Sequence, residues 1–168
     1  PPTNLTATGR CYSIDLRWDP SISPGVSGYN VHRSETTGSG YIKITPTPVV
    51  QNKYIDLNVT PFKSYYYVIT AVRDGRESEK SNESVAQSRD YITVGRDKDY
   101  SSIEGAVHFA TSTLAVEGIW VVIDPGTYEE PVIEIPKLIN FRSASGTIDV
   151  TWGGANHALE ITQALKGT

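Results

Sequence analysis

The chain has 168 residues, with 15 lysines and arginines against 19 aspartates and glutamates and a formal net charge of -4. This balance leaves no dominant basic face, so it argues against nucleic acid or an anionic membrane as a partner. No apolar run approaches the roughly 18 residues of a membrane-spanning helix, and the single cysteine, Cys11, excludes a disulfide within the chain.

Residues 1 to about 88 are predicted to form short strands separated by turns. SIDLRW (13–18) alternates apolar and polar residues, which is typical of a half-buried strand. YYYVITAV (65–72) consists mainly of aromatic and β-branched residues, which favour strands. One face of that strand is expected to carry Tyr65, Tyr67, Ile69 and Ala71. Many short strands with no helical periodicity indicate a β-sandwich.

The same segment resembles a fibronectin type III domain along its whole length. The resemblance rests on PTNLTAT, LRWDPS, GYNVHRS, VTPFKSYYYVITAV and GRESEKSNESV, taken in order. It implies that Trp18 is the core tryptophan of the sandwich. It also implies a tyrosine corner at Val59-x-Pro61 followed by Tyr65, in which the tyrosine hydroxyl bonds to upstream backbone. Domains of this family serve mostly as spacers or adhesive modules, so the fold alone does not give a function.

Two surface features of this segment bear on function. RDGR (73–76) lies in a hairpin loop, but its residue order differs from the integrin tripeptide, and we expect a charged turn with Gly75 at positive φ. Asn4, Asn58 and Asn82 begin short glycosylation patterns. Such patterns occur by chance, and Pro61 disfavours the second one.

DKDYSSIEGAVHFATS (97–112) is the one long stretch with helical periodicity. Ser101 and Glu104 predict a capping box at its start. His108 lies beside the apolar stripe and is predicted to be a partly buried structural residue, and Gly105 suggests a close approach. The stripe comprises Ile103, Ala106, Val107, Ala110 and Leu114. The helix is therefore expected to cover an apolar surface and to carry no catalysis.

Short apolar strands are predicted to follow the helix at regular intervals. They are IWVVID (119–124), PVIEIP (131–136), LINFRS (138–143), IDVTW (148–152) and ALEIT (158–162), with a turn at PGTY (125–128). VIEI and ALEI are near-copies, as expected of stacked solenoid turns. Because the first turn of a parallel coil needs a cover, the helix is interpreted as an N-terminal cap.

Residues 91 to about 162 resemble the start of the right-handed parallel β-helix of pectin methylesterases and pectin-lyase-like proteins. The matching positions are Asp97, Asp99, Tyr100, Ser102, Ile103, Ala106 and Val107, then Val122, Pro125, Gly126, Tyr128 and Glu130. The predicted fold class is thus mainly β. It comprises a fibronectin type III sandwich over residues 1–89 and a capping helix with the first coils of a short β-helix over residues 90–168.

No catalytic, cofactor-binding or metal-binding residue is predicted. In the resembled enzymes the catalytic aspartates, glutamine and arginine lie on later coils, and no position here matches them. Glu129, Glu130 and Glu134 are interpreted as solvated charges rather than an acid–base set. Trp152, beside two glycines, is the one candidate for stacking on a sugar ring. Trp120 is assigned to a buried strand.

Three functions are compatible with these patterns. The first is a non-catalytic extracellular structural or adhesion module at a bacterial cell surface, self-associating or binding a partner chain through the open β-helix end. The second is the N-terminal part of a secreted pectin esterase or polysaccharide lyase, because the expected coils are few and ITQALKGT at the end of the sequence has no capping segment. The third is a carbohydrate-binding module whose partner is polysaccharide. No cofactor is expected.

Overall fold

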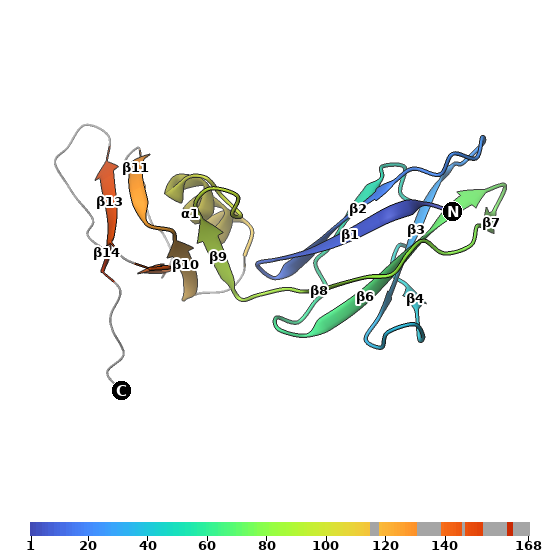
Figure 1. Cartoon of the computed structure of the whole chain (residues 1–168), viewed down its shortest axis with the longest axis horizontal. Helices are drawn as coiled ribbons and strands as arrows, with labels where there is room; N and C mark the ends of the chain where they lie inside the picture. The colour runs from blue at the N-terminus through green and yellow to red at the C-terminus, as the bar shows by residue number, and fades with distance from the viewer. Residues whose placement is uncertain (115–117, 131–138, 146, 153–160, 163–168) are drawn as a thin grey trace. The chain divides into compact units, whose positions relative to one another are not determined.

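The computed structural model describes residues 1–114, 118–130, 139–145, 147–152 and 161–162 (Figure 1). The chain divides into two compact units, Pro1–Arg89 and Asp90–Thr168. None of the described helical residues form a segment long and apolar enough to span a bilayer.

The first unit consists of two antiparallel sheets. One sheet has the order β1-β2-β5, with β1 at Thr3–Arg10, β2 at Ser13–Asp19 and β5 at Lys53–Asp56. The other has the order β4-β3-β6-β7, and β8 also pairs with β6. Its strands are β4 (Ile42–Lys43), β3 (Gly28–Ser34), β6 (Ser64–Arg73), β7 (Arg76–Glu77) and β8 (Ser84–Gln87). The predicted sandwich of short strands is confirmed.

The core lies between these sheets because strand residues alternate in direction. Ile14, Leu16 and Trp18 of β2 are buried against the inward face of β6. That face carries Tyr65, Tyr67, Ile69 and Ala71, all buried as predicted. The Trp18 and Tyr29 rings meet edge to face with centroids 5.6 Å apart. Each fully buried large apolar side chain stabilises such a core by roughly 1.5–3 kcal/mol.

The predicted corner and turn are both present in the sandwich. The backbone N–H of Thr60 donates to the Tyr65 hydroxyl at 3.2 Å, which is the upstream backbone contact expected of a tyrosine corner. Between β6 and β7, Asp74 and Gly75 have φ of 50° and 74°. Two consecutive positive φ values define the tight hairpin turn that follows the twist of its strands, and the prediction for Gly75 is confirmed.

The second unit contains parallel strand pairs and one described helix. Strands β9 (Tyr91–Val94), β10 (Ile119–Ile123) and β12 (Ile139–Ser143) form a parallel sheet of order β12-β10-β9. β11 (Gly126–Glu130) pairs in parallel with β13 (Thr147–Trp152). β14 (Ile161–Thr162) pairs with β13 in the antiparallel sense.

The helix α1 spans Ile103–Ser112 and begins later than predicted. Its N-cap is Ser102, whose hydroxyl accepts from the Gly105 N–H at 3.2 Å. The predicted capping box of Ser101 with Glu104 is therefore wrong. Ser102 holds the extended backbone that a cap requires, and a glycine three positions later has no side chain to return the bond.

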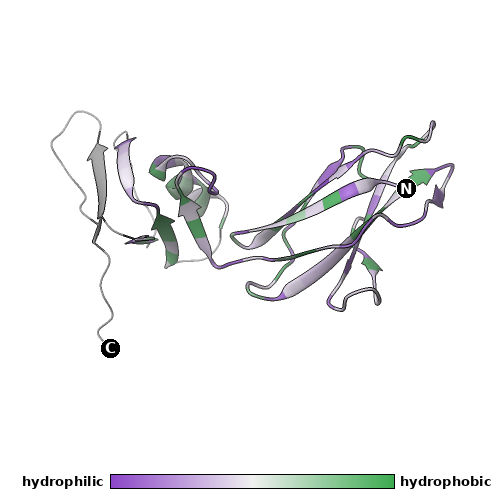
Figure 2. Ribbon diagram, viewed as in Figure 1, coloured by the Kyte–Doolittle hydropathy of each residue, from purple (hydrophilic) through white to green (hydrophobic). Residues whose placement is uncertain are grey.

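The helix covers the inner face of the parallel sheet, as expected. Ile103, Ala106, Val107 and Ala110 are buried, and α1 contacts β9, β10 and β11; Figure 2 shows the apolar colouring of β10. A Cβ on Gly105 would lie 3.1 Å from the Tyr100 ring, so the expected close approach exists. His108 is exposed, and the prediction of partial burial is wrong because one residue beyond Val107 turns about 100° away from the stripe.

Three predictions after the helix need correction or lie outside the described residues. Residues 125–128 are not simply a turn, because β11 begins at Gly126 and pairs with β13. PVIEIP (131–136) lies outside the described residues. Ile161 and Thr162 pair antiparallel to β13, whereas the next coil of a solenoid would pair in parallel. The parallel β-helix stays a prediction.

Candidate functional site

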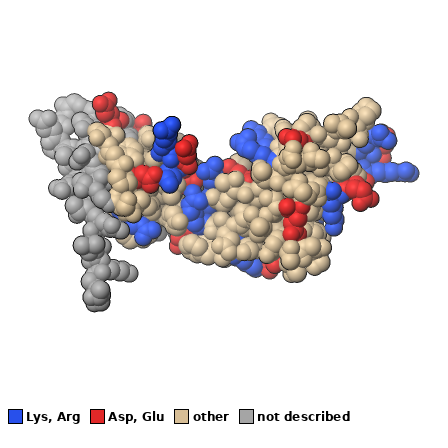
Figure 3. Space-filling model, in the orientation of Figure 1, with Lys and Arg blue, Asp and Glu red and all other residues tan. Residues whose placement is uncertain are grey.

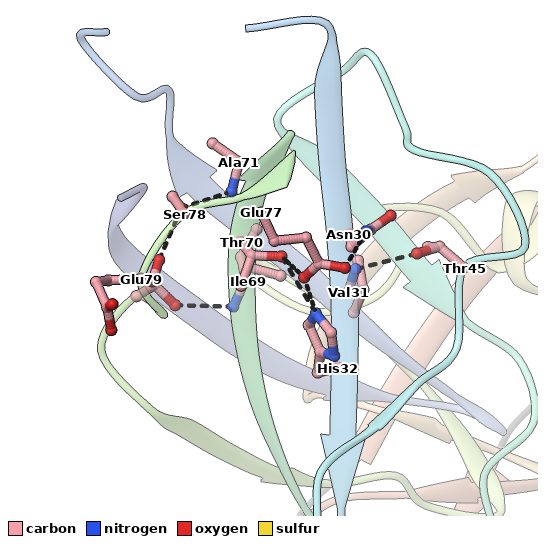
Figure 4. Close-up of polar contacts among 11 residues, drawn as sticks. Asn30, Val31, His32, Thr45, Ile69, Thr70, Ala71, Glu77, Ser78 and Glu79 are labelled. Carbon is pink, nitrogen blue, oxygen red and sulfur yellow. Dashed lines mark hydrogen bonds and ion pairs between the residues drawn. The ribbon is translucent and has the colours of Figure 1, made fainter. Parts of the chain in front are cut away.

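A cluster of polar side chains lies on the outer face of β3 and β6. Because Tyr29 and Val31 point into the core, Asn30 and His32 between and after them point outward. Thr70 of β6 faces the same side, and the hairpin brings Glu77 of β7 over all three. Figure 4 shows the Glu77 carboxylate between Asn30 and His32.

Both oxygens of the Glu77 carboxylate accept hydrogen bonds. The Asn30 amide Nδ2 donates to Oε1 at 2.7 Å, and the Thr70 hydroxyl donates to Oε2 at 2.5 Å. His32 Nε2 lies 3.0 Å from the same Oε2. Burial raises the pKa of this carboxyl, but the bonds from Thr70, Asn30 and His32 together outweigh burial and hold its pKa below the ordinary value.

This arrangement does not support nucleophilic catalysis. In a catalytic triad the two ring nitrogens of the histidine serve different partners. Here His32 Nε2 contacts both the Thr70 hydroxyl, at 3.2 Å, and the Glu77 carboxylate. Thr70 is also buried, so a substrate carbonyl has no access to its hydroxyl. The cluster fixes β7 against the sheet.

An open polar groove of about 510 Å³ adjoins this cluster. Its lining includes Ser21, Ser23, Arg73, Arg76 and Glu77. Figure 3 shows acidic and basic side chains side by side on the visible face of the sandwich unit, with no field of one sign. The groove therefore offers scattered hydrogen-bonding groups without the convergent charges of an anion site.

A second polar cluster lies deeper and joins the two sheets. The Arg33 guanidinium donates to Asp56 Oδ2 at 2.8 Å and to the Asn58 carbonyl at 2.6 Å. The Tyr67 hydroxyl donates to the same Asp56 oxygen at 3.0 Å. Burial, followed by the Asp56 charge, raises the pKa of Tyr67 far above its ordinary value. Tyr67 is fully buried, so this cluster supports the fold.

The structure places the predicted site residues as follows. The backbone of Trp152 pairs with Glu130 in the β11–β13 ladder, but its side chain lies outside the described part, as does Glu134. Glu129 is exposed, as expected of a solvated charge. Trp120 lies in β10, whose other residues are buried as expected of this strand, but its own side chain is 43% exposed. Within the described residues, no group of His, Cys, Asp and Glu is arranged to hold a metal ion.

No family model matches this chain. Among solved structures, it is 35% identical to a Fn3-like protein from Clostridium thermocellum, covering 52% of this chain and 90% of that one, with a TM-score of 0.47. The sandwich unit is fibronectin type III-like. Its resemblance in sequence to that family is thus confirmed at the level of the fold.

The curated relatives are named amylopullulanases. The chain is 42% identical over 86 residues to the protein of Thermoanaerobacterium saccharolyticum, which is 51% of this chain and 6% of that one. It is 40% identical over 84 residues to the protein of Thermoanaerobacter thermohydrosulfuricus, again 6% of that protein. The matched length is close to that of the fibronectin type III-like unit, and it is a small part of much longer proteins.

Proposed function

We propose that this chain is a non-catalytic part of an exported bacterial enzyme that acts on polysaccharide. The observation that carries the proposal is the 42% identity with a segment that makes up 6% of an amylopullulanase. A module that recurs as a small segment of so long a protein supplies spacing or orientation rather than the reaction. Of the three functions compatible with the sequence, the identity agrees best with a portion of a polysaccharide-active enzyme.

The polar groups of the sandwich support a non-catalytic role. Glu77 has both carboxylate oxygens engaged by neighbouring side chains. Asp56 is buried and paired with Arg33. A general acid or base needs access to its substrate and a pKa tuned toward the working pH, and neither carboxylate combines these properties.

We also propose that the chain has two domains, at residues 1–89 and 90–168. The second domain would form the first coils of a right-handed parallel β-helix. The parallel pairing of β9, β10 and β12 and of β11 with β13 supports this proposal. The position of α1 over the inner face of the first sheet also supports a cap. The alternative is a self-associating surface module in which a second copy or a partner chain covers the end of the coil.

The deciding experiment is the mass of the native polypeptide in its source, detected with an antibody raised against this chain. We expect one band far above 18.4 kDa that degrades an α-glucan in a gel overlay, while the isolated chain releases no reducing sugar. A native polypeptide of 18.4 kDa in a large assembly would contradict the proposal and support the self-associating module. Release of sugar by the isolated chain would also contradict it.

A further inference from the structure

The outer face of the parallel sheet in the second unit carries large aromatic side chains. In β10, Ile119, Val121 and Ile123 are buried toward the helix side, and Trp120 between them points the other way. Trp120 is 43% exposed. Tyr91 alternates in the same manner with the buried Ile92 of β9.

These two aromatic residues lie side by side. Trp120 is the register partner of Tyr91 in the parallel β9–β10 ladder, so their backbones are about 4.8 Å apart, the ordinary spacing of paired strands. Both side chains leave the sheet on the same face. Together they form a short aromatic strip that extends across two strands.

Arg142 of β12 completes the strip. Its guanidinium carbon lies 5.5 Å from the Trp120 ring centroid and 5.7 Å from that of Tyr91. A guanidinium held by cation–π contacts to both rings has a fixed position but keeps N–H donors that the rings do not use. No ion pair joins Arg142 to any residue that the structure describes. The side chain is exposed, so these donors face solvent.

We propose that Tyr91, Trp120 and Arg142 form a binding site for the pyranose rings of a neutral glucan chain. This inference rests on the proposed function, because that function places the chain beside polysaccharide. The C–H face of a pyranose is apolar and matches an exposed indole, which buries much area at little entropic cost. The ring hydroxyls lie at its edge, where the guanidinium donors of Arg142 reach them.

The test is binding of the whole 168-residue chain to pullulan and soluble starch, measured by affinity electrophoresis and calorimetry. We expect Trp120→Ala to weaken binding at least tenfold, and Arg142→Gln and Tyr91→Ala at least threefold. Phe62→Ala is the matched control, since Phe62 is an exposed aromatic residue of the sandwich unit, 60% exposed. Its affinity is expected to equal that of the parent chain.

A second readout covers the case in which Trp120→Ala does not fold. In the parent chain, bound glucan should protect tryptophan fluorescence from quenching by acrylamide. Trp120→Phe keeps an aromatic ring in the strip, so its glucan affinity should stay within about threefold of the parent, but the protection should be lost. Protection that persists in Trp120→Phe would overturn the site.

The remaining outcomes separate this site from the proposed function. If Trp120→Ala and Arg142→Gln leave glucan affinity unchanged, the proposed site is overturned, whereas the proposed function is unaffected. Failure of every neutral glucan to bind also overturns the site, while the native mass decides the function independently. Salt-sensitive binding to polygalacturonate in place of glucan overturns the ligand class, because that result requires a charged partner for Arg142.

Discussion

Phe62 holds a left-handed backbone at an exposed position of the sandwich unit. Its φ is 63° and its side chain is 60% exposed. Such a backbone costs an L-residue with a Cβ roughly 1–2 kcal/mol, and little burial compensates here. The strained backbone at Phe62, in the loop before β6, therefore lowers the stability of the folded sandwich unit.

We expect Phe62→Gly to raise the free energy of unfolding by about 0.5 kcal/mol, since relief of the left-handed strain exceeds the extra entropy of an unfolded glycine. Urea unfolding measures this change. Thr60→Gly in the same loop is the control and should lower stability by about 0.5–1 kcal/mol, because Thr60 has no left-handed strain to relieve. Equal effects of the two substitutions would contradict the argument.

Asp56 is the centre of the buried cluster that joins β5 to β3 and β6. Asp56→Asn removes the charge that faces Arg33 and leaves that guanidinium largely buried without its counter-ion. We expect the free energy of unfolding to fall by about 3 kcal/mol. Asp74→Asn is the control: its side chain is 90% exposed and its contact to Arg73 is 3.8 Å, so a change below about 0.5 kcal/mol is expected. A small effect at Asp56 would contradict the assignment.

Glu77 makes the sandwich sensitive to acid. Its pKa in the folded state lies below its ordinary value of 4.5, so its stabilising contribution is complete above that value. The contribution is lost as the pH falls through the folded pKa. Between pH 6 and 3, we expect Glu77→Gln to lose less stability than the parent chain, as measured by urea unfolding at each pH. If the unfolding free energies of the two chains fell equally with pH, the stabilising role of the Glu77 carboxylate would be contradicted.

At the scale of elements, the start of α1 depends on one of two adjacent serines. Ser102→Ala removes the hydroxyl that caps the Gly105 N–H. We expect this change to lower the free energy of unfolding of the second unit by about 1 kcal/mol. Ser101 is exposed, so Ser101→Ala should change stability by less than about 0.5 kcal/mol. Thermal unfolding followed by circular dichroism compares the two, and the reverse order of effects would restore the capping box predicted from sequence.

The segment after β7 is joined to β6 and β1 by side-chain hydrogen bonds in addition to backbone ones. Ser78 and Ser81 accept from the Ala71 and Ile69 N–H groups of β6, each at 2.9 Å. Asn82 accepts from the Leu5 N–H and donates to the Leu5 carbonyl of β1. The Ser78 and Ser81 N–H groups also donate to the Ala71 and Ile69 carbonyls, each at 2.8 Å, so side-chain and backbone bonds together close this side of the sandwich. They also engage the Asn82 side chain, so that glycosylation pattern lies on a structural residue.

At the scale of the molecule, the Pro1–Arg89 unit has its own core and its own closing bonds. Arg89 donates its N–H to the Arg10 carbonyl at 2.9 Å and accepts from the Tyr12 N–H at 2.8 Å. Phe62 N–H donates to the Ser88 carbonyl at 2.8 Å. The last residues of the unit are thus held by the end of β1, the turn after it and the loop before β6.

We expect a fragment of residues 1–89 to unfold cooperatively with the midpoint of the corresponding transition in the full chain. A fragment that stops at residue 86 lacks these bonds and should be less stable by about 1–3 kcal/mol, because buried backbone groups lose their partners. Differential scanning calorimetry measures both fragments. An unfolded 1–89 fragment would contradict the independence of the unit.

Sequence patterns predicted some residues well and missed others for identifiable reasons. The burial of Trp18 and of the inward face of β6 follows from a period of two, which requires no knowledge of neighbours. The exposure of the His108 and Trp120 side chains was missed because each residue lies beside apolar residues along the chain while its side chain points away from them. The cluster around Glu77 left no signal, since its members come from three strands and a glutamate in a turn-rich segment resembles a solvated charge.

The sequence by itself determined the sandwich, the helical cover and the position of the turn at Gly75, because local periodicity and backbone preference act on neighbours along the chain. Tertiary structure alone decided which serine caps α1, which carboxylate accepts hydrogen bonds from neighbouring strands and which aromatic residues share a face with Arg142. Those features depend on strand register, which brings residues distant in sequence to within hydrogen-bond or ring-contact distance.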